Sequence, residues 1–290
     1  MKTRIFIIAL LVLLVAAACS PVTPATEIQD DGPDGVATVP VSDARNQDDT
    51  KQPADQGANA PAAEAIWKND PQEIVIRGTF CCGFSTPVAP LNYIPDFQIW
   101  GDGRYIWVEY REDGSRVVWQ AQLSQDQLKG ILEDAIQAGF FDWKERYENN
   151  TVADFADKCL SVQLESQSKK VCEYFEGAPQ AFHDLYDRLA SGMGMKGSEF
   201  VPERAYLVSY PVAEFSAMPL SENDVIWPAD KLFPLTDAEE KGVWVEGEAL
   251  ELAWRAVNQN PWAAFVREGS GVYQVSVQVP GLSFRAPPTR

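Results

Sequence analysis

The sequence feature that most constrains the fold is a series of short strand-like segments joined by turn signals. Residues 101–103 (GDG) and 112–115 (EDGS) are typical of tight hairpin turns. Segment 104–110 (RYIWVEY) is apolar on both alternating faces, which favours a central strand. We therefore expect an antiparallel meander, with strands at the following segments: 73–77, 97–100, 104–110 and 117–123.

Two amphipathic helices are predicted to pack on this sheet. Ser124 and Gln127 have the spacing of a capping box, and Gly139 marks the end of the first helix. The second helix opens near Pro179. Its apolar stripe contains Phe182, Leu185 and Leu189, and the stripe of the first contains Leu128, Ile131, Leu132, Ala135 and Ile136. The predicted fold class is α+β: over residues 68–192, an antiparallel meander sheet packed by two amphipathic helices.

A hairpin formed by 158–164 and 169–175 suggests how the cysteines pair. If the turn has two residues, Cys159 lies directly opposite Cys172. Local geometry then favours a Cys159–Cys172 disulfide and leaves Cys81 and Cys82 as a vicinal bridge or as two free thiols. The competing pattern joins the 81–82 loop to the hairpin through two bridges.

Residues 200–290 predict a smaller α+β region. Segments 205–212 and 272–279 have strand character, and 246–258 has helical periodicity. This region either folds independently or extends the first sheet.

Residues 20–66 form a segment rich in Pro, Ala, Asp, Gln and Gly without helical or strand periodicity. It contains nine acidic residues and only two basic ones, Arg45 and Lys51. Because such a chain buries too little apolar surface to offset its conformational entropy, we expect a disordered, extended tether.

The first 19 residues have the composition of an export signal. Lys2 and Arg4 precede an apolar run that is too short to span a bilayer, and three alanines lie before Cys19. This resembles a bacterial lipobox, with Ala16 in place of the preferred Leu. The resemblance implies cleavage before Cys19, a diacylglyceryl thioether on its sulfur, usually an acylated amine, with chains such as palmitate, and attachment to membrane lipid. Because Ser20 follows, it also implies the outer membrane in a host with two membranes. The alternative is an ordinary secretory signal with an incidental cysteine.

The order of motifs between 74 and 192 resembles an uncharacterised family of bacterial extracytoplasmic domains. The first cysteine loop departs from that family, since no second cysteine lies among residues 84–86. The resemblance implies a fold unit and carries no known activity. The motifs that carry it are Cys81-Cys82-Gly83, Gly101-Asp102-Gly103, Gly139-Phe140-Phe141, Lys169-Lys170-Val171 and Gly177-Ala178-Pro179.

Charge excludes some partners. Acidic residues outnumber basic ones by 42 to 24, a net charge of −18 that becomes −20 when Lys2 and Arg4 are removed. Such a surface repels nucleic acid and anionic headgroups, so we expect neither as a partner.

No residue pattern predicts catalysis, a cofactor or a metal site. His183 is the only histidine, and it has no nucleophile elbow or zinc-ligand set around it. Glu109, Asp102 and Asp113 are candidates for a carboxylate pair, although turns commonly contain Asp. The tryptophans at 100, 107, 119, 143, 227, 244, 254 and 262 either form an aromatic binding face or lie in the core.

These observations predict a lipid-anchored extracytoplasmic protein that binds an envelope polymer or a protein partner. The alternatives are a hydrolase of envelope polymers that uses a carboxylate pair and a purely structural surface protein.

Overall fold

The computed structural model describes residues 64–81, 88–148, 151–213 and 224–289. Within these ranges the fold is α+β, as predicted, with two sheets and four α-helices. Cys19, Cys82 and the predicted tether up to residue 63 lie outside the described residues.

The larger sheet has eight strands in the order β5-β7-β6-β1-β2-β3-β4-β8. Neighbouring strands are antiparallel except β5 and β7, which are parallel. The run from β1 to β4 is the predicted meander, and a register shift in β1 separates Ile74 from Ile76. The strands are β1 (Ile74–Cys81), β2 (Phe97–Trp100), β3 (Arg104–Tyr110), β4 (Arg116–Gln122), β5 (Arg146–Glu148), β6 (Asp157–Gln163), β7 (Ser168–Tyr174) and β8 (Ser198–Glu199).

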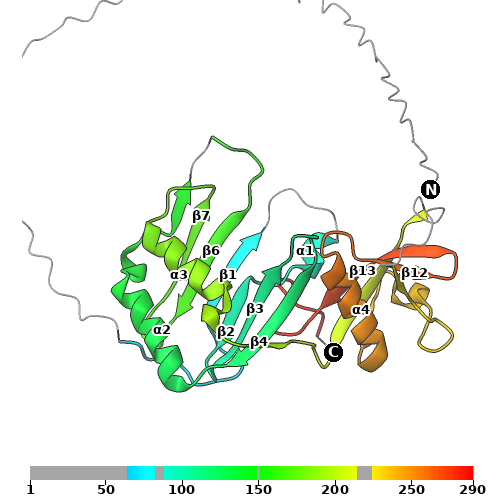
Figure 1. The fold of residues 1–290 in the computed structure, drawn as a ribbon, viewed down its shortest axis with the longest axis horizontal. Coiled ribbons are helices and arrows are strands. Elements are labelled where there is room, and N and C mark those ends of the chain that lie inside the picture. Colours follow the sequence, from blue (N-terminus) through cyan, green and yellow to red (C-terminus); the bar gives the residue numbers. More distant parts are fainter. Residues whose placement is uncertain (1–63, 82–87, 149–150, 214–223, 290) are drawn as a thin grey trace, which may run out of the picture. The chain divides into compact units, whose positions relative to one another are not determined.

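Helices α2 (Gln125–Gln137) and α3 (Gln180–Ala190) cover one face of this sheet (Figure 1). The capping box of Ser124 and Gln127 is present, and Gly139 follows the end of α2 in a left-handed conformation. Both predicted stripes face the sheet and form one core with alternate residues of the strands. This core includes Leu128, Leu132, Phe182, Leu185, Leu189, Leu160, Val162 and Val171.

A second sheet has five strands in the order β10-β12-β13-β9-β11. Helix α4 (Gly247–Gln259) packs against it, and α1 (Ala89–Asn92) contacts β13. Its strands are β9 (Ala205–Pro211), β10 (Val225–Ile226), β11 (Val243–Val245), β12 (Phe265–Glu268) and β13 (Gly271–Gln278), and 3-10 turns lie at Phe140–Asp142, Gly192–Gly194 and Leu235–Ala238.

The second sheet shares a core with part of the first. Apolar side chains on β2, β3 and β4 join the buried residues of β9, β13 and α4; they are Trp100, Ile106, Val108 and Val118. Asn92 on α1 links the two sheets: its Nδ2 donates to the Val275 carbonyl at 3.0 Å, its Oδ1 accepts from the Val277 amide at 2.9 Å, and its carbonyl accepts from Arg116 Nη2 of β4 at 3.0 Å. Buried Arg116 adds a bond to Asn258 at 2.7 Å. Half of one sheet face is therefore covered by the C-terminal region.

Candidate functional site

The C-terminal region covers only half of one face of the eight-stranded sheet, and the other half of this face carries polar side chains. Strand register places Gln98 beside Arg77, Arg77 beside Ser161, and Ser161 beside Lys170, so the four residues form a row across β2, β1, β6 and β7. The neighbouring positions Leu160, Val162 and Val171 point into the helix-covered core. Because side chains alternate along a strand, the polar row lies on the face opposite α2 and α3.

A groove of about 380 Å³ lies over this row. Ser168 and Lys170 are exposed, and Arg77, Ser161 and Gln163 are half-buried, so the groove is open to solvent. Its polar lining consists of Arg77, Glu145, Ser161, Gln163, Ser168, Lys169 and Lys170. The volume is in the range of small-molecule sites, but the lining is mostly polar, unlike the mainly apolar lining of most ligand pockets, so the groove suits a polar ligand.

Arg77 is held in place at the edge of the groove. Its Nε donates to Gln98 Oε1 at 2.8 Å, and Gln98 Nε2 donates to the Gly281 carbonyl at 2.8 Å. Gln98 is fully buried, so this chain of bonds orients the guanidinium. Desolvation by burial lowers the pKa of Arg77, and the nearby Tyr93 raises it to a smaller extent.

A disulfide lies next to the polar row on the same face. Cys159 and Cys172 are bonded directly across β6 and β7, with their Cα atoms 4.1 Å apart. The Cys172 amide donates to the Glu145 carbonyl of the neighbouring segment, so the pair is a non-hydrogen-bonded one, in which opposite side chains lie closest. The Leu164 amide donates to the Gln167 carbonyl, which confirms the register behind the predicted pairing.

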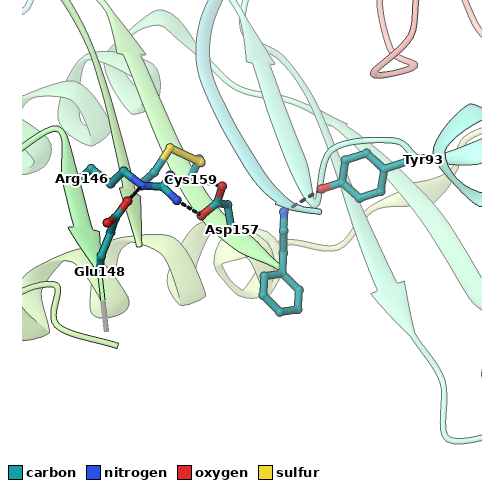
Figure 2. Close-up of a disulfide and its surroundings, with 7 residues drawn as sticks. Tyr93, Arg146, Glu148, Asp157 and Cys159 are labelled. Carbon is teal, nitrogen blue, oxygen red and sulfur yellow. Dashed lines mark hydrogen bonds and ion pairs between the residues drawn. A yellow bond between two sulfur atoms is a disulfide. The ribbon is translucent and has the colours of Figure 1, made fainter. Parts of the chain in front are cut away.

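Charged residues surround this disulfide (Figure 2). Arg146 on β5 pairs with Glu148, and its Nη1 donates to Asp157 Oδ2 at 3.2 Å. At the same end of β1, the Phe80 amide donates to the Tyr93 hydroxyl at 2.7 Å (Figure 2). Arg146 is therefore neutralised by acids of its own chain.

Cys81 is also disulfide-bonded. The cysteine to which it is bonded lies outside the described residues. Cys82 also lies outside them, so the predicted Cys81–Cys82 bridge stays a prediction. The competing pattern, in which both hairpin cysteines join the 81–82 loop, is wrong because Cys159 and Cys172 bond to each other.

The exposed aromatic cluster consists of phenylalanines rather than the tryptophans that the sequence suggested. Phe155 lies 5.9 Å from Phe80 and 5.2 Å from Phe175, measured between ring centroids, and all three are exposed. Among the tryptophans considered for a binding face, Trp262 alone is an exposed large side chain in the described ranges, whereas Trp100, Trp107, Trp227 and Trp254 are buried. The tryptophans are mainly core residues.

The acid–base candidates do not assemble into a catalytic group. Glu109 is exposed and accepts from the Trp119 indole at 2.8 Å. His183 Nε2 lies 3.3 Å from Oε1 of buried Glu173 on β7. The acid that it contacts is therefore on a strand and is not one of the acids beside it on α3. Within the described ranges, no group of three or more His, Cys, Asp or Glu residues could hold a metal ion.

Asp96 is the acid most altered by its surroundings. Burial raises its pKa to about 6, although a hydrogen bond from Tyr186 and the charge of Lys158 oppose the increase. The Tyr186 hydroxyl donates to Asp96 Oδ2 at 2.7 Å, and Lys158 Nζ lies 5.0 Å from the centre of the Tyr186 ring. Sequence reasoning missed Asp96 because an acid before a strand has no local signal of burial.

Comparison with known protein families identifies the part of the chain that carries these features. Residues 73–191 match the model described as "Domain of unknown function (DUF6438)". They form a DUF6438 domain. No curated protein and no solved structure matches the chain significantly.

The DUF6438 domain contains the polar row, the groove and the Cys159–Cys172 disulfide. The C-terminal sheet lies outside the match, yet Gly281 from that region anchors Gln98 and through it Arg77. No helix in the described part of the chain has the length and hydropathy needed to cross a bilayer.

Proposed function

We propose that this protein is an extracytoplasmic lipoprotein, anchored through Cys19, whose DUF6438 domain binds a ligand in the groove over β1, β6 and β7. The observation that carries the binding role is the open polar half-face. Its side chains converge on a groove of about 380 Å³, while the adjoining half of the same face is buried under the C-terminal sheet. A surface with only a structural role needs no such arrangement of half-buried polar groups.

Export and anchoring rest on the N-terminal sequence. A basic start, a short apolar run and three small residues precede Cys19. The Cys159–Cys172 disulfide supports this location, because disulfides persist mainly in oxidising compartments. The expected site of action is the cell envelope, with a small molecule, an envelope polymer or a protein as partner.

Membrane fractionation tests the anchor. We expect the wild type to pellet with membranes and to be released by detergent, and Cys19→Ser to become soluble or to remain uncleaved. Mass spectrometry of the N-terminal peptide should find acyl chains on Cys19. A wild type that is free in the medium and begins at Ser20 or later would exclude lipid anchoring.

A groove-blocking variant tests the binding site. Ser161→Trp places an indole between Arg77 and Lys170 and should abolish the thermal stabilisation that a small-molecule panel gives to the full chain. The matched control is Arg255→Trp on α4, which is exposed and does not line the groove. Stabilisation that survives Ser161→Trp would place the binding site elsewhere.

A further inference from the structure

We propose that the groove binds an oxyanion, a carboxylate or a phosphate on a small hydroxyl-bearing molecule, between Arg77 and Lys170. This inference rests on the proposed function, because it assumes that the groove is the ligand site. It adds the chemical class of the ligand and assigns the residues that would recognise it.

Strand register brings the two cations to either side of one small residue. Arg77 pairs with Ser161, and Ser161 pairs with Lys170. Neighbouring strands lie about 4.8 Å apart, so the Cα atoms of Arg77 and Lys170 are separated by roughly 10 Å. Lys170 is long enough to reach a group held above Ser161, whose hydroxyl adds a further donor, whereas Arg77 is held at its Nε by Gln98 on β2 and offers its terminal nitrogens to the part of the group nearest β1.

Neither cation has an acidic partner within the described ranges. No carboxylate oxygen lies within 4.0 Å of Arg77 or Lys170 there, and neither side chain has a hydrogen bond, ion pair or ring contact beyond those given above. Most lysines and arginines of the described ranges likewise have no such ion pair, so what distinguishes these two is their position on either side of Ser161. Arg146 on the same face is the contrast, since it is paired with Glu148 and Asp157.

The remaining lysine of the groove, Lys169, has hydrogen-bond partners within the chain. Lys169 donates to the backbone carbonyls of Phe141 and Trp143, so its ammonium group stabilises the chain after α2. The positive charge available to a ligand therefore comes from Arg77 and Lys170.

The geometry of Arg77 favours a planar or tetrahedral oxyanion. Gln98 accepts from Nε, which leaves the two terminal nitrogens for a second partner. Two parallel N–H donors match a carboxylate or a phosphate in a bidentate arrangement. Because Gln98 is buried and itself bonded to Gly281, the guanidinium loses little freedom when the ligand binds.

The rest of the lining suits hydroxyl groups. Ser168 presents a hydroxyl, and Gln163 donates to the Leu164 carbonyl, which leaves its side-chain oxygen as an acceptor. Glu145 lies at the groove as a single acid and would disfavour an anion to a modest extent. A sugar acid or a sugar phosphate has both the charge and the hydroxyl groups that this lining can bind.

Titration of the isotope-labelled full chain, followed by NMR, tests the assignment with glucuronate, inorganic phosphate and uncharged glucose as probes at constant ionic strength. We expect at least one anion to bind in the groove and glucose to bind at least about tenfold more weakly. Arg77→Gln should weaken anion binding by about tenfold or more, and Lys170→Gln by several-fold. The matched controls are Arg255→Gln and Lys241→Gln, which are exposed and outside the groove.

Three further results sharpen the test. Arg77→Lys retains the charge but loses the fork of donors, so its affinity should fall between those of the wild type and Arg77→Gln. Glu145→Gln should strengthen anion binding. The exposed Lys170→Gln variant keeps the test decisive if the half-buried Arg77 variants fold poorly.

The outcomes separate this inference from the proposed function. Preference for phosphate over glucuronate would assign a phosphate ligand, and the reverse a carboxylate. The inference is overturned if neither anion binds, or if both bind equally well to Arg77→Gln and Lys170→Gln. If glucose binds as well as the anions and Ser161→Trp prevents this, the groove is a ligand site and only its anionic specificity is wrong.

Discussion

Two halves of one sheet face differ in what covers them, although their backbones pair in the same way. The half formed by β2, β3 and β4 is mainly apolar, and its apolar side chains are buried under the C-terminal sheet. The half formed by β1, β6, β7 and β5 is polar and lies beneath an open groove. The difference shows that the C-terminal region covers the part of the face with apolar side chains and leaves the polar part open to solvent.

The boundary between the halves passes through Gln98. Its amide accepts from Arg77 on the open side and donates to Gly281 from the covering region. The covering region therefore takes part in orienting a groove residue that it does not itself supply. The predictions below test the difference in burial between the halves, beginning with the largest expected effect.

Ile106→Ala should be the most destabilising of these changes. Ile106 lies on the covered half, is 1% exposed, and packs in the core shared by both sheets. Loss of its side chain removes apolar burial and leaves a cavity, so the free energy of unfolding should fall by about 2–5 kcal/mol in urea titrations. On the open half, Lys170→Ala should change it by less than about 0.5 kcal/mol. Equal effects at the two positions would contradict the assignment of covered and open halves.

Removal of the cross-strand disulfide should have the next largest effect. The Cys159→Ala, Cys172→Ala double variant releases a loop with a sequence separation of 13 and should lose about 3 kcal/mol. The open half has little apolar burial on this face, so the bridge helps to hold β6 and β7 together there.

Substitution is a better test than reductant, because Cys81 is also disulfide-bonded and would be reduced as well. The single variant Cys159→Ala should show the same loss of stability under conditions that prevent intermolecular bridges. If the double variant melts like the wild type, the disulfide is dispensable and the hairpin alone sets the register.

Asp96→Asn should stabilise the protein at neutral pH. The pKa of Asp96 is raised from 3.8 to about 6 by burial, so the folded state keeps a proton that the unfolded state has released between these values. Stability therefore falls as the pH rises from about 4 to about 6, with a loss of at most about 3 kcal/mol above that window. Asparagine keeps an acceptor for Tyr186 and avoids the charge.

Urea titrations at pH 4.5 and 7 measure this effect as the difference between variant and wild type. The advantage of Asp96→Asn should grow with pH across the window. Asp230→Asn is the matched control, because Asp230 is exposed and does not pair with Lys158. A constant difference between Asp96→Asn and the wild type at both pH values would mean that Asp96 titrates normally.

The sequence predicted the elements whose signals are local. The meander follows from alternation and from turns such as 101–103, and α2 follows from its capping box and stripe. The Cys159–Cys172 bridge needed only the hairpin register. Segment 104–110, apolar on both faces, correctly indicated a strand buried on both sides.

The sequence did not predict features that depend on distant contacts. Strand β5 has three residues and pairs in parallel with β7, so it has too little length for a periodic pattern. The four-residue helical turn α1 places Asn92 between the sheets, and it too is short for a periodic pattern. Arg77 has no distinguishing signal in the sequence, and only the strand register shows that it lies in one row with Ser161 and Lys170.

A matched pair of serines gives the smallest expected effect. Ser209 on β9 is 1% exposed and donates to the Leu235 carbonyl, so Ser209→Ala leaves a buried acceptor without its donor and should cost about 1–2 kcal/mol. Ser161 is half-buried in the groove, and its side chain has no hydrogen-bond partner in the described ranges. Ser161→Ala should therefore change the free energy of unfolding by less than about 0.5 kcal/mol. Urea titrations of the two variants would contradict this comparison if Ser161→Ala were the more destabilising. If Ser161→Ala leaves stability unchanged but weakens anion binding, the hydroxyl serves the groove rather than the fold.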